Sequence, residues 1–143
     1  MPPQIAAAHK VFISNGGGVS LDDILHITVI HGGPDRTYNE FYGAMKSWGR
    51  YDLVSSPSNA DLVLKISFDL SDTIFLTKSD VVLGNLRLVI LDPKTNVALW
   101  TMVEYVPRAA LAGNRDKNFD RSMNTLLDRF KELAAPSTAN TAP

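Results

Sequence analysis

The residues most suited to metal chemistry in this sequence are two histidines, His26 and His31, which lie close to Asp22, Asp23 and Asp35. Imidazole nitrogens and carboxylate oxygens are common ligands of divalent transition metals. On a strand, however, a separation of five residues would place the two imidazoles on opposite faces. The spacing therefore favours surface histidines over a metal site, and we expect no bound metal or other cofactor.

A second candidate is the run Asn15-Gly16-Gly17-Gly18, which follows a short apolar stretch. Backbone amides in a glycine-rich loop can approach a phosphate closely. The run matches neither GxGxxG nor GxxxxGK[ST], and the residues after it do not begin a helix. The pattern favours a flexible turn over a nucleotide-binding loop.

Other catalytic arrangements are absent from the sequence. Cysteine is missing, no Gly-x-Ser-x-Gly segment occurs, and the three histidines are scattered. Asp22 and Asp23 have no neighbouring group that would separate their pKa values for acid and base roles. We therefore predict that the protein is not an enzyme. A metal-dependent or nucleotide-binding enzyme using residues 15–18 or His26 and His31 is an alternative.

The third candidate is a surface on a predicted hairpin over residues 85–107. Apolar residues alternate through Leu86, Leu88 and Ile90, and a turn at 92–96 separates them from a second alternating run. A four-residue loop at 93–96 would pair Ile90 with Leu99, Leu88 with Thr101 and Leu86 with Val103. This apolar face should lie under helices.

The opposite face of this hairpin would carry a Trp and a Met between charged residues, with a diagonal ion pair between Arg87 and Glu104. Such a composition is typical of the centre and rim of a protein interface. If residues 71–84 or 19–36 fold over it, the same face is ordinary core. The candidate interaction surface comprises Arg87, Val89, Leu91, Trp100, Met102 and Glu104.

Length and charge limit the class of protein. A chain of 143 residues favours one domain with a core that needs no disulfide or metal. A formal net charge of -1 makes nucleic acid an unexpected partner. No apolar run reaches the ~18 residues of a transmembrane helix. The start has no signal-peptide pattern and looks like the trimmed beginning of an exported chain.

The remaining elements follow from local patterns. Residues 10–14 predict a first strand, and 51–55 predict a second strand parallel to it. Residues 37–48 predict a helix that begins with a capping box of Thr37 and Glu40. Clean alternation predicts a strand at 61–69, and residues 119–133 have the spacing of an amphipathic helix.

Together these elements predict one α+β domain over residues 10–134. We expect a mixed, mainly antiparallel sheet of about five strands with two helices packed on one face. Residues 1–9 are expected to form a flexible lead, and residues 135–143 a disordered tail. Residues 19–36 are read as an inserted arm or an ordered loop.

Four segments of the chain follow one another in a familiar order. They are the helix NEFYGAMKSWGRYDLV, the strand start Ala60-Asp61-Leu62-Val63-Leu64, the hairpin LVILDPKTNVALW and the final amphipathic helix. In this order the chain resembles small bacterial envelope domains. These include the amino-terminal domain of TolB-like proteins, the lipoprotein activators of penicillin-binding proteins, curli-secretion-type lipoproteins and several uncharacterised lipoprotein families. The chain departs from their pattern in having Asn96 where glycine is usual and no acylatable cysteine at the start.

This resemblance implies an extracytoplasmic accessory or interaction module of the periplasm or envelope, and it supplies no catalytic residues. The partner would be another protein or a second copy of the chain. A homodimeric structural domain without a ligand is the alternative.

Overall fold

In the computed structural model of this chain, the described residues are 2–18, 31–70, 82–107, 109 and 111–135. They form a single α+β domain around one five-stranded mixed sheet, as the sequence predicts. The strand order is β2-β1-β3-β4-β5. The strands are β1 (Lys10–Gly18), β2 (Asp52–Leu53), β3 (Leu62–Leu70), β4 (Val82–Leu91) and β5 (Ala98–Pro107).

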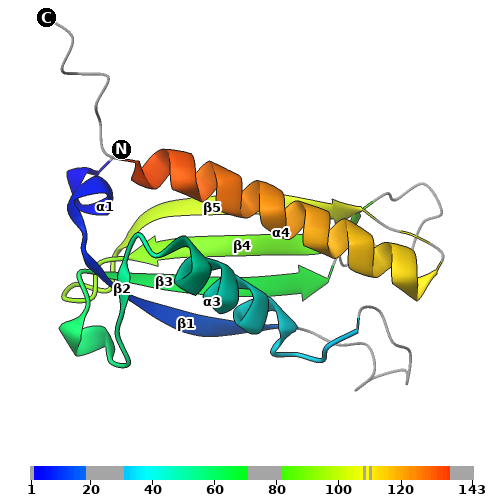
Figure 1. The fold of residues 1–143 in the computed structure, drawn as a ribbon, viewed down its shortest axis with the longest axis horizontal. Coiled ribbons are helices and arrows are strands. Elements are labelled where there is room, and N and C mark those ends of the chain that lie inside the picture. The colour runs from blue at the N-terminus through cyan, green and yellow to red at the C-terminus, as the bar shows by residue number, and fades with distance from the viewer. Residues whose placement is uncertain (1, 19–30, 71–81, 108, 110, 136–143) are drawn as a thin grey trace, which may run out of the picture.

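Two long helices lie across the same face of this sheet (Figure 1). They are α3 (Arg36–Trp48) and α4 (Ala112–Ala134), and a short 3-10 helix, η1 (Pro57–Asn59), precedes β3. α3 packs on β1 and β3, whereas α4 packs mainly on β5. We call the sheet face under these helices the covered face and the opposite one the outer face.

The core lies between the covered face and the two helices. The alternation in β3 is confirmed, because Leu62, Leu64 and Ile66 are fully buried. The corresponding residues of β4 are equally buried. The helices contribute an apolar stripe at helical spacing, which consists of Phe41 and Met45 from α3 and Phe119, Met123, Leu126 and Phe130 from α4.

The chain start is helical in place of the flexible lead that we expect for residues 1–9. Pro3–Ala7 form α1, and the side chain of Ile5 is fully buried in the core. The carbonyl of Ile5 accepts a hydrogen bond from the Tyr51 hydroxyl. Arg50 donates to the carbonyls of Ala6 and Ala134, at 3.0 and 3.1 Å, and so joins the ends of α1 and α4. These contacts come from residues distant in sequence, so no local pattern predicts this helix.

The start of α3 also differs from the prediction. Its N-cap is Asp35, with no side-chain capping bond, while Thr37 is buried inside the helix. Glu40 cannot complete a capping box with Thr37, because it pairs instead with Arg36 one turn earlier. The end of the helix is as expected, since Gly49 adopts a left-handed conformation that favours glycine.

The parallel pairing of β1 with β2 is confirmed, and β1 also runs parallel to β3. Asp61 holds the start of β1 beside β3, because one carboxylate oxygen accepts the backbone N–H groups of His9 and Lys10 at 2.9 Å. These two bonds lower the pKa of Asp61. Asp61 therefore has a structural role in this fold.

Candidate interaction surface

The β4–β5 hairpin is present, but a bulge changes its register. The predicted loop is correct, since the backbone N–H of Asp92 donates to the carbonyl of Val97 and Leu91 pairs with Ala98. The next pair is Ile90 with Trp100, because one extra residue of β5 is inserted there. Every later residue of β5 consequently points to the face opposite to the predicted one. Residue alternation carries no signal of a bulge.

The six residues of the candidate surface are therefore divided between the two faces of the sheet. Trp100 and Met102 pair with the buried residues Ile90 and Leu88, so they lie on the covered face, and Met102 is 4% exposed. Glu104 lies on the same side, where its carboxylate is 2.8 Å from Arg129 of α4. The prediction that all six share one face is wrong.

Arg87, Val89 and Leu91 remain on the outer face. The predicted ion pair between Arg87 and Glu104 does not form, because the two side chains lie on opposite sides of the sheet. The Arg87 guanidinium instead lies 4.0 Å from the carboxylate of Asp69 on β3. An exposed pair at this distance contributes at most about 1 kcal/mol.

The outer face consists of rows of side chains that run across the strands. No described helix lies on this side of the sheet (Figure 1). The strand register gives the rows Phe12–Val63–Leu91, Ser14–Lys65–Val89–Thr101, Ser67–Arg87–Val103 and Asp69–Asn85–Tyr105. We call the first of these the apolar row.

Charge and apolar surface are separated along this face. The apolar row lies where β1 and β3 begin, and Val63 at its centre is 9% exposed. Lys65 and Arg87 occupy the middle rows, while Asp69 is in the last row. Tyr105, in that last row, is 63% exposed. The face is too apolar at one end for an ordinary solvated surface.

The free edge of β5 is closed by side chains of α4. Arg129 donates to the carbonyl of Val103 at 3.0 Å, and Ser122 donates to that of Tyr105 at 2.7 Å. Asn118 donates to the carbonyl of Pro107 at 3.2 Å. These bonds occupy acceptors that a further strand would need, and the bulge distorts the first part of β5. The edge is thus poorly suited to strand addition.

Sequence analysis did not identify this edge closure. The only signal is that Asn118, Ser122 and Arg129 recur at spacings of four and seven beside the apolar stripe of α4, which places them on one side of the helix.

The glycine run is part of β1 and does not form the expected turn. Each glycine has a steric reason to be there. A Cβ at Gly16 would lie 2.8 Å from the carbonyl oxygen of Ile66, Gly17 has a φ of +94°, and a Cβ at Gly18 would lie 2.8 Å from the carbonyl oxygen of Pro34. Packing and strand geometry account for the run without a phosphate ligand.

His31 belongs to a cluster of charges between the starts of α3 and α4. Its Nδ1 contacts the carboxylate of Asp116, which also accepts a hydrogen bond from Arg36 at 2.7 Å. Arg36 further contacts Glu40 at 2.5 Å and Asp120 at 2.7 Å. Its guanidinium lies over the ring of Phe119. We call these charged residues the Arg36 cluster.

Burial and hydrogen bonding oppose each other in the Arg36 cluster. Burial by itself would raise the pKa of Asp116, but hydrogen bonds from His31 and Arg36 outweigh it and lower the pKa to about 2. Burial raises the pKa of Glu40, and its contact with Arg36 offsets only part of that rise. Arg36 is balanced by carboxylates on both helices, so the cluster joins α3 to α4.

The candidate metal site that the sequence disfavours would need His26 as well as His31, and His26 lies outside the described residues. Among residues that the structure describes, no group of three or more potential ligands is placed to hold a metal ion. No described helix is both long and apolar enough to cross a membrane.

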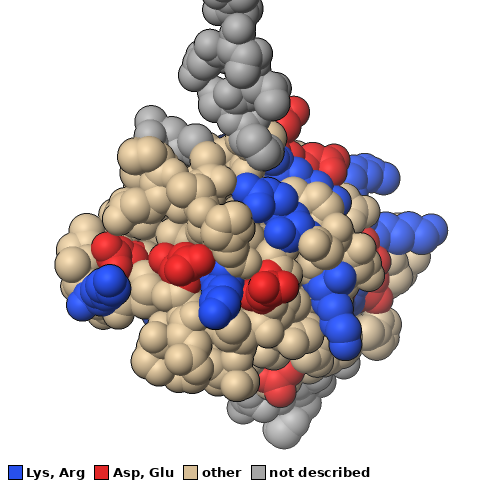
Figure 2. Space-filling model, turned by 60° about the vertical axis from the view of Figure 1, so that its left-hand side comes forward, with Lys and Arg blue, Asp and Glu red and all other residues tan. Residues whose placement is uncertain are grey.

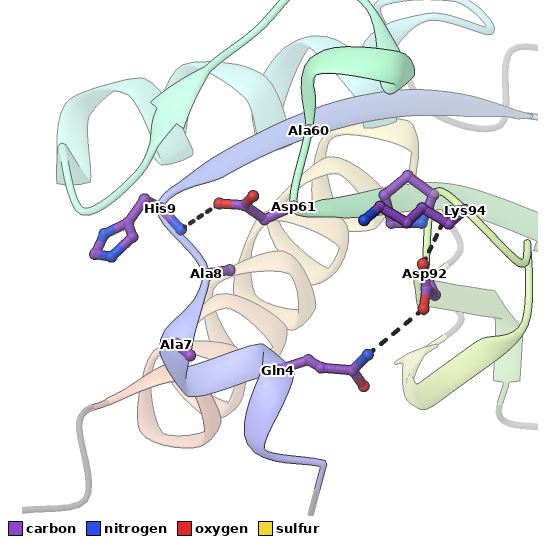
Figure 3. Close-up of a pocket in the computed structure, with 9 residues that line it drawn as sticks. Gln4, Ala7, Ala8, His9, Ala60, Asp61, Asp92 and Lys94 are labelled. Carbon is purple, nitrogen blue, oxygen red and sulfur yellow. Dashed lines mark hydrogen bonds between the residues drawn. The ribbon is translucent and has the colours of Figure 1, made fainter.

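A polar groove of about 370 Å³ lies at the end of the sheet (Figure 3). Gln4 of α1 and Asp92 of the hairpin face each other across it, 3.5 Å apart, and Asp61 and Lys94 lie along its walls. Asp92 also accepts the backbone N–H of Lys94, and Asp61 anchors β1, so both carboxylates stabilise the fold. At this end of the molecule acidic and basic side chains are interspersed (Figure 2).

Comparisons with known proteins give structural matches only. No protein-family model matches the sequence, and no curated protein sequence matches it. A protein of family DUF330 from Xanthomonas campestris matches with a TM-score of 0.60 at 11% identity, over 96% of this chain and 90% of that one. A putative neuraminyllactose-binding hemagglutinin homolog from Helicobacter pylori matches with a TM-score of 0.50 at 15% identity, over 89% of this chain and 86% of that one.

Lipoprotein GNA1162 from Neisseria meningitidis gives a TM-score of 0.40 at 11% identity, over 84% of this chain and 99% of that one. The first two matches show that the chain has the same fold as these two proteins. At 11% and 15% identity they show the fold alone.

Proposed function

We propose that this chain is a non-enzymatic interaction module of the bacterial cell envelope, which binds a protein partner through the outer face of its sheet. The order of its segments resembles that of envelope domains. The fold is shared with a DUF330 protein and with a putative neuraminyllactose-binding hemagglutinin homolog. These similarities support an accessory or binding role in the envelope.

The observation that carries the proposal is the asymmetry of the sheet. One face is covered by two helices, whereas the outer face combines an apolar row with Lys65, Arg87 and an exposed Tyr105. Apolar side chains beside arginine and an exposed aromatic ring are residue types enriched at protein interfaces. The edge of β5 is closed by α4, so the face is the better docking surface of the two.

Photocross-linking in cells tests the face directly. A benzophenone amino acid is placed at Val89 on the outer face, and a matched control carries it at Asn124, an exposed position on α4. We expect discrete adducts from position 89 in the envelope fraction and none from 124. Equal adducts at both positions, or none at 89, would contradict the proposal.

The compartment is tested separately. Expression from the native gene in the native host, followed by fractionation, should recover the protein with the periplasmic or membrane fraction. Recovery only with cytoplasmic markers would reject the envelope assignment and leave the proposed binding face to be judged by the cross-linking result.

A further inference from the structure

We propose that the free border of β1 is a further docking site, which takes an extended segment of a protein partner as an added strand. This site is separate from the outer face, because it uses backbone groups at the edge of the sheet. The two edges of the sheet differ. The edge at β5 is closed by side chains of α4, whereas β2 lies beside only the first part of β1 (Figure 1).

The ladder between β1 and β2 ends early. β2 pairs only with Lys10 and Val11, and the last bond runs from the N–H of Val54 to the carbonyl of Val11 at 2.9 Å. Backbone groups alternate between the two sides of a strand, so Ile13 and Asn15 direct theirs to the same side as Val11. β3 occupies the other side of β1. No described segment pairs with Ile13 or Asn15 on this border.

The sequence of this border has none of the usual protections of a sheet edge. Such edges are commonly protected by charged side chains, proline, a bulge or a covering element. The part of β1 beyond β2 reads Phe12-Ile13-Ser14-Asn15, without charge or proline. Its pairing with β3 is regular over these residues, and the irregularity follows between Asn15 and Gly18. The border therefore presents a regular row of backbone donors and acceptors, which is complementary to another extended chain.

Two tyrosines of α3 lie on the flank of the helix that faces this border. Arg36 contacts Asp120 of α4, so its flank of α3 faces α4. Tyr38 and Tyr42 are on the opposite flank, one turn apart, and their ring centroids are 5.8 Å apart. Both side chains are half-buried against the core. Because α3 packs on β1 and β3, the flank that points away from α4 faces the free border of β1.

The two tyrosines lie beside the unpaired part of β1. α3 begins near the end of β1, because the carbonyl of Pro34 lies close to Gly18. The helix ends near the start of β1, where the N–H of Asp52 donates to the carbonyl of His9 at 2.8 Å. α3 thus runs antiparallel to β1, and its first half covers the second half of the strand. Both tyrosines are in that first half.

This arrangement specifies the kind of segment that would bind. A strand that pairs with Ile13 and Asn15 places every second side chain on the covered side, next to the two tyrosine rings. Aromatic rings favour apolar or aromatic neighbours. The remaining side chains would lie beside Phe12 and Ser14, which are half-buried, and can be polar. The partner segment is therefore one in which apolar residues alternate with polar ones.

A synthetic peptide tests the site. The probe is the acetylated and amidated peptide TVTFTVT, added to the full chain labelled with ¹⁵N and followed by NMR. At a peptide concentration of about ten times Kd, hydrogen exchange of the Ile13 and Asn15 amides should slow about tenfold. The amides of Val103 and Tyr105, at the closed edge, should not change. Slow exchange of Ile13 and Asn15 in the free chain, or no slowing with the peptide, would overturn the proposal.

Two substitutions at one position isolate the backbone contribution. Asn15→Pro removes an N–H that faces the border, and proline is tolerated at such an edge position. Asn15→Ala keeps that N–H, while both variants lose the side-chain bonds to Gly17 and Asp35. The far-UV circular dichroism spectra of both should match the parent.

The peptide should bind Asn15→Ala like the parent and Asn15→Pro about tenfold or more weakly. Equal binding to the two variants would overturn strand addition. If Asn15→Pro does not fold, the exchange measurement on the parent chain decides the proposal by itself.

Discussion

The two faces of one sheet differ in how completely they are closed. On the covered face, Leu86, Leu88 and Ile90 are fully buried under α3 and α4. On the outer face, the residues between them in β4 have partly exposed side chains. The same strand thus contributes to the core on one side and to the proposed binding surface on the other. A substitution on the covered face should therefore lower the stability of the fold. A substitution at the next position of the strand, on the outer face, should instead weaken partner binding.

The largest expected effect comes from breaking the covered face. Leu88→Ala should lower the free energy of unfolding by about 2 to 5 kcal/mol, because it leaves a cavity between the sheet and the helices. Val89→Ala, one residue further on, should cost less than about 1 kcal/mol, since the outer face can adjust around it. Urea unfolding of both variants measures the difference. Equal losses would mean that the outer face is also core.

A second substitution, Gly84→Ala, tests how tightly the covered face is packed near the start of β4. A Cβ at Gly84 would lie 2.4 Å from the carbonyl oxygen of Asp69 and 2.8 Å from the ring of Phe68. Gly84→Ala should therefore destabilise the fold by about 1 to 3 kcal/mol through overpacking. Gly113→Ala is the control, because open space surrounds that position in α4. It should raise stability slightly, by less than about 1 kcal/mol, because Gly113 lies in the first turn of the helix.

The Arg36 cluster fixes the helices that close the covered face, and it makes the closure depend on pH. The pKa of Asp116 is lowered to about 2, so its ionised form stabilises the fold above about pH 4, and that contribution disappears as the pH falls toward 2. Burial shifts Glu40 in the opposite direction, so its ionisation opposes folding as the pH rises through its raised pKa.

Asp116→Asn should lower stability by about 1 to 3 kcal/mol at pH 7 and by much less near pH 2. Asp128→Asn changes an exposed carboxylate of the same helix and should have a small effect at both pH values. Unfolding by urea at a series of pH values measures both. A loss from Asp116→Asn that does not change with pH would show that its carboxylate charge contributes nothing.

Sequence alone identified the covered face because alternation in β3 and helical spacing in α4 are strong local signals. The same reasoning assigned Trp100, Met102 and Glu104 to the wrong side. The cause is a single extra residue in β5, which a period-two pattern cannot reveal. The prediction of a capping box at Thr37 was wrong for a related reason. Glu40 is paired with Arg36, and Arg36 is itself held by Asp116 of α4, which is remote in sequence.

The smallest expected effect lies at the edge where the two faces meet. Ser122 is 6% exposed and donates to the carbonyl of Tyr105, so Ser122→Ala should lower stability by about 1 kcal/mol and leave that acceptor unpaired. The more informative result is association. An opened edge can accept another strand, so the variant should bind thioflavin T on prolonged incubation, whereas Thr125→Ala, an exposed position on α4, should not. If the variant loses stability but stays free of such aggregates, the bulge in β5 protects the edge without help from α4.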